Sequence, residues 1–179
     1  LNISKETEIG IIEMGANHKG EIKNLCEIAM PNIGYITNFG KAHLEGFKSL
    51  KGVIEGKSEL YNYLIEKNEK ILINSNDKTQ ISQTSEYKKK KAFGNSKYSD
   101  FVFKFISPKN ENISIKNDDF IFSSSIYGKY NFNNICAAIA FGKIFDISND
   151  LIQNGISSYK PKNNRSEIIK RKDTTIILD

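Results

Sequence analysis

The chain has 179 residues, of which 39% are hydrophobic and 26% charged, and its formal net charge is +5. This composition is near the globular average, which excludes a wholly disordered chain, and the length suits one domain rather than a large multidomain enzyme. Lysine supplies nearly all of the positive charge, because Arg165 and Arg171 are the only arginines. Dispersed lysines usually solvate a surface, so we expect no nucleic-acid partner; an anionic small-molecule substrate is compatible with the charge.

Two cysteines, Cys26 and Cys136, lie far apart in apolar, helix-like surroundings without metal-ligand spacing. We therefore expect buried free thiols in a reducing compartment. No signal peptide opens the chain, and no apolar run approaches the roughly 18 residues that a membrane-spanning helix needs. These features predict a cytoplasmic protein without a membrane partner.

The first half of the chain predicts a parallel βαβ arrangement. Buried strands are expected at residues 8–14, 33–39 and 70–74, helices at 21–29 and 50–67, and a turn after residue 74. Glu13 would end the first strand, and the loop after Phe39 would follow the second. Because ligands gather at the C-terminal ends of parallel strands, we expect both to lie at one rim of the sheet.

The second half has a different pattern. The lysine run at 88–91 is expected to be a solvated loop, and short aromatic or β-branched runs from about 92 to 127 predict an antiparallel sub-lobe. Helices are then expected at 131–146 and 148–159, followed by strands at 166–171 and 174–179. The whole chain, 1–179, is thus predicted to be one α/β domain, with a mostly parallel sheet flanked by helices.

The segment Gly52-Val-Ile-Glu-Gly56-Lys57-Ser58 imitates a phosphate-binding loop. A true loop has four residues between its glycines and follows a strand directly, and this segment instead continues as a helix. We therefore interpret it as helix.

Glu13, His43 and Lys57 are the candidate catalytic residues, because all three could meet at the predicted rim. A carboxylate suits Mg²⁺, whereas a lysine fits such a site only after it has captured CO₂ as an anionic carbamate. The alternatives are ordinary: a paired glutamate, a packed histidine and a solvated lysine.

Five motifs carry a resemblance that goes further. They are EMGANHKGEI (13–22), ITNFGKAHLEGF (36–47), EGKSELY (55–61), YGKYNFNNICAA (127–138), and NNRSEII with IILD (163–179). In their order and spacing the chain resembles the central ATPase domain of the Mur ligases of peptidoglycan synthesis, a fold similar to that of phosphate-loop NTPases. The pattern GANHxGE with AHLEGF is specific to the branch that adds D-Ala-D-Ala to UDP-N-acetylmuramoyl-tripeptide.

The resemblance implies a role for each matched residue. Glu13 and His43 would be ligands of two Mg²⁺ ions, and Lys57 would be the carbamylated lysine that helps to hold the second. Asn131 and Asn134 would contact the adenine end of ATP, Arg165 the ribose and phosphates, and Asp179 the ribose hydroxyls. Tyr130 departs from the family, which usually has histidine there, and no role is assigned to His18 or Glu21.

The resemblance also implies a reaction. ATP would phosphorylate the terminal carboxylate of the tripeptide, and the amine of D-Ala-D-Ala would displace the phosphate. The alternatives are another Mur-type or folylpolyglutamate-type ligase, or a non-catalytic nucleotide-binding or scaffolding domain. The chain starts at Leu1 and stops directly after a strand-like run. We therefore expect a fragment, monomeric and inactive by itself, that lacks the phosphate loop, the UDP-sugar domain and the C-terminal domain.

Overall fold

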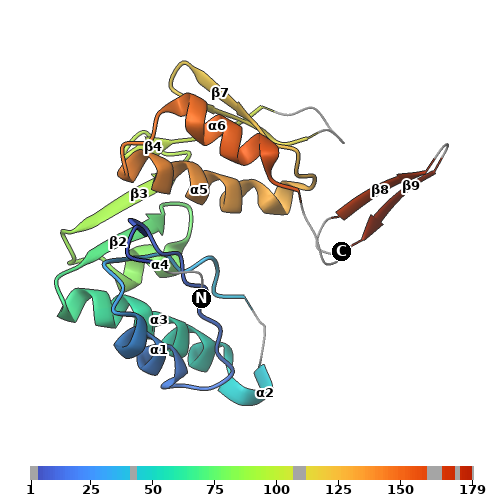
Figure 1. Ribbon diagram of the computed structural model, residues 1–179. Coiled ribbons are helices and arrows are strands. Elements are labelled where there is room, and N and C mark those ends of the chain that lie inside the picture. The colour runs from blue at the N-terminus through green and yellow to red at the C-terminus, as the bar shows by residue number, and fades with distance from the viewer. Residues whose placement is uncertain (1–3, 41–43, 107–111, 161–166, 172–173, 179) are drawn as a thin grey trace. The chain divides into compact units, whose positions relative to one another are not determined.

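The computed structural model describes residues 4–40, 44–106, 112–160, 167–171 and 174–178, in two compact units (Figure 1). The first unit comprises Leu1–Leu72 and Ser82–Lys90, and the second comprises Ile73–Ile81 and Lys91–Asp179.

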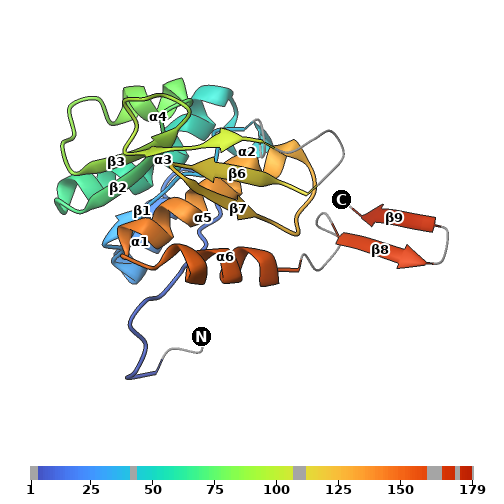
Figure 2. The same cartoon turned by 90° about the horizontal axis from the view of Figure 1, so that it is seen from above.

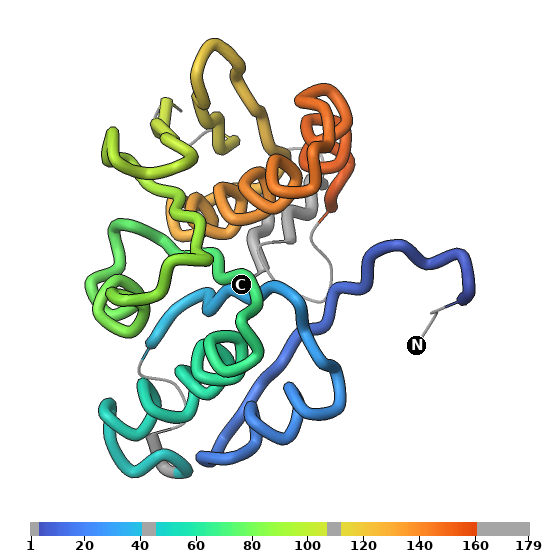
Figure 3. Tube along the Cα trace, turned by 90° about the vertical axis from the view of Figure 1, so that its left-hand side faces the viewer, coloured from blue at the N-terminus to red at the C-terminus, as the bar shows by residue number. Residues whose placement is uncertain are grey.

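Two helices pack side by side in the first unit: α1 (Glu21–Ala29) and α3 (Leu50–Glu66) (Figures 1 and 3). Helix α1 buries Ile22 and Cys26, which lie four residues apart and therefore on one face. Helix α3 begins after Ser49, whose hydroxyl accepts a hydrogen bond from the Gly52 amide at 3.0 Å. The polar cap and the apolar stripe explain why this stretch is a stable helix.

A parallel sheet has the strand order β1 (Ile33–Gly34), β2 (Lys70–Asn74), β3 (Lys90–Gly94) and β4 (Phe101–Val102). Strands β1 and β2 pair in parallel, and the chain between them forms the short helix α2 (Leu44–Phe47) and then α3. A Cβ at Gly34 would lie 2.7 Å from a methyl carbon of Leu64, so α3 lies directly against β1. This is the βαβ unit of the fold.

The second unit contains a small antiparallel sheet, in the order β5 (Lys104–Phe105), β6 (Ser114–Asn117) and β7 (Phe120–Ser123). Helix α6 (Asn149–Ser158) lies along β7 (Figure 2). The side chain of Gln153 bonds to both the amide and the carbonyl of Ser123, at 2.8 and 2.9 Å. These two bonds satisfy backbone groups at the edge of the sheet.

The remaining elements also belong to the second unit, apart from the last residues of α4. They are α4 (Lys78–Gln83), the single turn η1 (Lys129–Asn131), α5 (Phe132–Ile144) and the hairpin β8 (Glu167–Arg171) with β9 (Thr174–Leu178). Helices α5 and α6 approach closely at Gly142, where a Cβ would lie 2.6 Å from the side chain of Ile152.

The α/β class, the mostly parallel sheet with flanking helices and the small antiparallel sheet are confirmed. The strand predicted at 8–14 is wrong: these residues follow an irregular path (Figure 3). Ile11 is 94% exposed. An apolar run becomes a strand only where a neighbouring edge supplies hydrogen bonds, and no described strand pairs with it.

Three smaller predictions also need correction. The strand expected at 33–39 is only Ile33–Gly34, and the lysine run already enters β3 at Lys90. Residues Phe101–Val102, expected in the antiparallel sub-lobe, form β4 and pair in parallel with β3. The turn predicted after residue 74 is present, and helix α4, which no pattern predicted, follows it.

Candidate metal and nucleotide site

Lys57 is the best-defined candidate residue. Helix α3 carries it half-buried, and its ammonium donates to the carbonyl oxygen of Asn38 at 2.7 Å and to the side-chain oxygen of Asn38 at 3.4 Å. Burial lowers the pKa of Lys57, because removing an ammonium from water disfavours its charged form. A lysine in this setting releases its proton more readily than a solvated one.

Helix α3 also binds the GANHKGE loop (residues 15–21), through two glutamates one turn apart. Glu55 pairs with the ammonium of Lys19. Glu59 accepts from the backbone amides of Gly20 at 2.6 Å and Lys23 at 3.0 Å, at the start of α1. Glu59 therefore supplies the N-terminal cap that no side chain within α1 provides.

The loop itself is closed by Glu21. Its carboxylate accepts from the amides of Asn17 at 2.7 Å and His18 at 3.2 Å, and it lies 3.1 Å from Nδ1 of His18. These hydrogen bonds, the one from Asn17 foremost, lower the pKa of Glu21. These contacts of His18 and Glu21 lie within the loop and stabilise its conformation.

The other two candidate metal ligands are Glu13 and His43. Glu13 is exposed in the irregular segment, so the prediction that it ends a strand is wrong. His43 lies outside the described residues. Across the described part of the chain, no hydrogen bond or ion pair joins Glu13 to Lys57, and no three His, Cys, Asp or Glu side chains gather as metal ligands. A metal set that includes His43 remains a prediction.

The two predicted adenine contacts do lie together. Asn131 is the N-cap of α5 and Asn134 lies in its first turn, and the side-chain nitrogen Nδ2 of Asn134 donates to the side-chain oxygen of Asn131 at 3.4 Å. Asn131 in turn donates to the carbonyl of Tyr127 at 2.8 Å. Arg165 and Asp179 lie outside the described residues, so their predicted contacts stay predictions.

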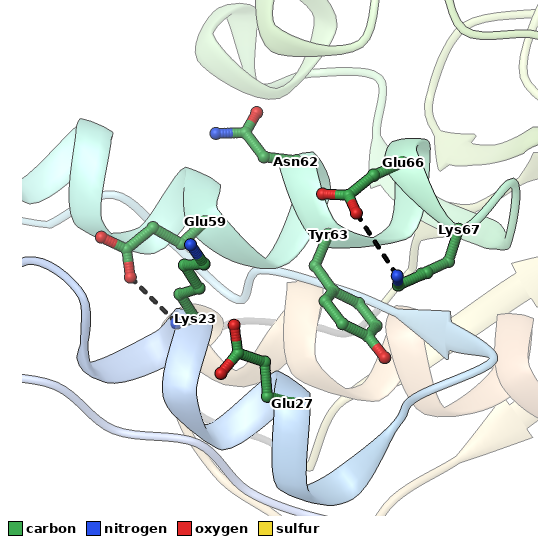
Figure 4. A pocket seen from close by; sticks show the side chains of 7 residues that line it. All are labelled: Lys23, Glu27, Glu59, Asn62, Tyr63, Glu66 and Lys67. Atoms are coloured by element: carbon green, nitrogen blue, oxygen red, sulfur yellow. Dashed lines mark hydrogen bonds and ion pairs between the residues drawn. The ribbon is translucent and has the colours of Figure 1, made fainter.

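A hollow of about 350 Å³ between α1 and α3 contains none of the predicted site residues (Figure 4). Charged and polar side chains line it, and two of them, Glu66 and Lys67, form an ion pair at 3.3 Å. The lining residues are Lys23, Glu27, Glu59, Asn62, Tyr63, Glu66 and Lys67.

Two contacts of the site could not be predicted from the sequence. Asn38 lies in the matched ITNFG motif, but the motif does not indicate that Asn38 binds Lys57. Glu59 lies two residues after Lys57 in EGKSE, and its bond to α1 spans 36 to 39 residues of chain.

Glu13 and Lys57 can bind Mg²⁺ together only if Lys57 loses its positive charge. The carboxylate of Glu13 is a suitable hard ligand, whereas an ammonium on Lys57 would repel the ion. The half-buried position lowers the pKa of Lys57 and so increases its neutral fraction relative to that of a solvated lysine, and only a neutral amine adds to CO₂. A carbamate at Lys57 would supply the missing anionic oxygens.

Solved structures define the class of fold. The chain superposes on a crystal structure of MurF from Acinetobacter baumannii with a TM-score of 0.82 and 23% identity, covering 99% of this chain and 40% of that one. A MurF ligase from Thermotoga maritima in complex with ADP gives 0.76 and 23%, covering 92% and 39%. The fold is that of Mur ligase domains.

The family follows from the sequence. Residues 1–142 match the model of the Mur ligase middle domain, and the chain belongs to this family. The UDP-N-acetylmuramoyl-tripeptide–D-alanyl-D-alanine ligase of Bacillus subtilis is 34% identical over 172 residues, which are 95% of this chain and 37% of the relative. The Escherichia coli protein of the same name is 27% identical over the whole chain and 41% of its own length.

The chain thus spans about two fifths of the relatives that it matches along its whole length. Among the described residues, no helix has the length and apolar character needed to cross a membrane.

Proposed function

We propose that the protein containing this chain is an ATP-dependent amide ligase that joins D-Ala-D-Ala to UDP-N-acetylmuramoyl-tripeptide. The observation that carries the proposal is the 34% identity to the Bacillus subtilis ligase of that name, which extends over 95% of the chain. Membership of the Mur ligase family supports the use of ATP, and a neighbour of the same fold is complexed with ADP.

The metal site would use Glu13, His43 and a carbamate on Lys57. Two Mg²⁺ ions, when bound, would neutralise the charge that spreads over the phosphoryl oxygens during transfer. The chain itself would hold in place the anionic oxygens of Glu13 and of the carbamate that bind these ions. Asn38 contributes by binding Lys57, since its carbonyl lies 2.7 Å from the amine.

The nucleotide would lie against the start of α5. Asn131 and Asn134 would contact the adenine, and their mutual hydrogen bond supports this by fixing both amides. Arg165 would bind near the ribose and phosphates, and Asp179 would accept from the ribose hydroxyls. Residue 130 would offer a phenol where the family usually has an imidazole.

The reaction would proceed in two steps. The terminal carboxylate of the tripeptide attacks the γ-phosphate of ATP and forms an acyl phosphate, with ADP leaving. The amine of D-Ala-D-Ala then attacks the acyl carbon, the new amide bond forms and phosphate leaves. The chain's residues act in both steps by orientation and electrostatics rather than as nucleophiles.

The proposal includes the remaining expectations from the sequence: a single domain over 1–179 with a sub-lobe at about 92–127, a cytoplasmic location and a monomeric state.

ADP release by the full-length protein tests the assignment. We expect release only when ATP, Mg²⁺, the UDP-tripeptide and D-Ala-D-Ala are all present. Release that depends on glutamate instead of D-Ala-D-Ala would indicate a folylpolyglutamate-type ligase. If no amine leads to ADP release, the protein would instead be a non-catalytic domain of this fold.

A further inference from the structure

The turn that precedes α5 carries an aromatic ring at the surface. Residues 128–131 form this turn, which is closed by a hydrogen bond from the amide of Asn131 to the carbonyl of Gly128 at 2.9 Å. Tyr130, inside the turn, is 60% exposed. An exposed tyrosine is ordinary by itself. Tyr130 differs because a neighbouring residue fixes where its ring lies.

Gly128 holds the ring in place. A Cβ at this position would lie 2.4 Å from Cε1 of Tyr130, 2.9 Å from Cζ and 3.0 Å from Cδ1. The ring therefore packs directly on the backbone of residue 128, in space that any other side chain would occupy. Gly128 also has a φ of 87°, a backbone conformation that favours glycine. A ring packed in this way loses little further conformational freedom when a ligand stacks on it.

Two amide side chains follow the ring directly. Asn131 is the next residue and Asn134 lies one helical turn further on, and their side chains share the 3.4 Å hydrogen bond. The bond from Asn131 to the carbonyl of Tyr127, at 2.8 Å, ties this pair to the same turn. Amide groups suit the edge of adenine, where N6 donates and N7 accepts, whereas an aromatic ring suits its flat face. The turn thus presents both kinds of contact that a purine base makes.

We propose that the adenine of ATP stacks on the ring of Tyr130, and that Gly128 is a positioning residue for this ring. The inference deepens the proposed function and rests on it, because it requires that the nucleotide lies at the start of α5. It makes the departure from the family at position 130 a determinant of base selectivity. A purine should bind better than a pyrimidine, because it covers more of the ring.

ADP binding to the full-length protein, measured by calorimetry, tests the role of the ring. Tyr130→Leu should weaken ADP binding by roughly ten- to a hundredfold, the loss typical of removing an aromatic partner from a base. Tyr130→Phe should bind ADP as the wild type does, because it keeps the ring and removes only the hydroxyl. The wild type should prefer ADP to CDP, and Tyr130→Leu should lose most of that preference.

Gly128→Ala tests the positioning role. The added methyl would displace the ring, so ADP should bind more weakly than to the wild type. Backbone strain at position 128 affects this variant with or without the ring, whereas the displacement requires Tyr130. Gly128→Ala should therefore cost clearly less affinity in the Tyr130→Leu background than in the wild type. Equal losses in the two backgrounds would contradict the positioning role.

Two controls separate the base from the rest of the nucleotide. Inorganic tripolyphosphate, which has no base, should bind equally to Tyr130→Leu and to the wild type. Tyr98→Leu removes a tyrosine that is 86% exposed in the loop between β3 and β4, and it should leave ADP binding unchanged.

The outcomes distinguish this inference from the proposed function. Wild-type ADP affinity in a folded Tyr130→Leu protein overturns the stacking role and leaves the ligase assignment intact. A wild-type protein that binds no ADP overturns the nucleotide site, and this inference with it. If Tyr130→Leu does not fold, Tyr130→Gln, which is polar and has no ring, replaces it under the same criteria.

Discussion

At the scale of single residues, Lys57 shows what motif and structure each contribute. The motif EGKSELY singles out the lysine, while the structure adds its bond to Asn38 and the burial that lowers its pKa. The sequence could not predict Asn38, because its position against α3 depends on how the chain returns from β1. Three of the other candidates, His43, Arg165 and Asp179, lie outside the described residues and rest on the motifs alone.

The proposed carbamate role of Lys57 predicts chemical rescue. In the full-length protein, Lys57→Ala should reduce ligase turnover by at least about a hundredfold, because the proposed anionic metal ligand would be lost. A short carboxylic acid such as acetate should restore part of the rate by occupying the vacated volume. Turnover is measured against acetate concentration.

Lys57→Arg is the informative companion variant. It keeps a positive charge and length at position 57, but an arginine does not form the carbamate. It should therefore be as inactive as Lys57→Ala. Near-normal turnover in either variant would exclude the carbamate role.

At the scale of elements, α3 organises the first unit. It packs on α1 and β1, seats Phe47 and binds the GANHKGE loop through Glu55 and Glu59. The sequence predicted this helix nearly to the residue, because its apolar period and its Ser49 cap are local signals. Its contacts to distant segments are not local, and so periodicity could not reveal them.

Strands depend on distant parts of the chain even more than helices do. The run at 70–74 forms β2 because neighbouring parallel strands bury it. The similarly apolar run at 8–14 has no strand to pair with in the described chain. Strand formation depends on a partner that the local sequence does not identify. Helices α1, α5 and α6 have their hydrogen bonds within the element, and all three were predicted to within two residues at each end.

Glu59 gives the prediction at this scale. Glu59→Ala removes both acceptors from the start of α1, which should cost about 1 kcal/mol of local stability. That corresponds to about fivefold faster amide hydrogen exchange in α1 of the full-length protein. Exchange is followed by mass spectrometry of the peptide covering residues 20–29.

The control on the same helix is Glu66→Ala. Glu66 is exposed and pairs with its neighbour Lys67 at 3.3 Å, without a hydrogen bond or ion pair to α1 in the described part of the chain, so its loss should leave exchange in α1 unchanged. Equal exchange in Glu59→Ala and wild type would show that the cap contributes nothing.

At the scale of the whole molecule, the fold and the family agree. The chain matches the Mur ligase middle domain over residues 1–142, and it covers 40% of a MurF structure with a TM-score of 0.82. Composition and periodicity alone predicted an α/β domain; only the five motifs pointed to this family. The reason is that many unrelated functions share such folds, and function depends on the site.

The formation of the joined product is the most direct test of this assignment. The full-length protein is incubated with ATP, Mg²⁺, UDP-N-acetylmuramoyl-tripeptide and D-Ala-D-Ala, and the mixture is analysed by mass spectrometry. We predict a UDP-linked pentapeptide whose mass is the sum of the two substrates less one water. ATP hydrolysis without that product, or an equal yield with other amines, would contradict the assignment.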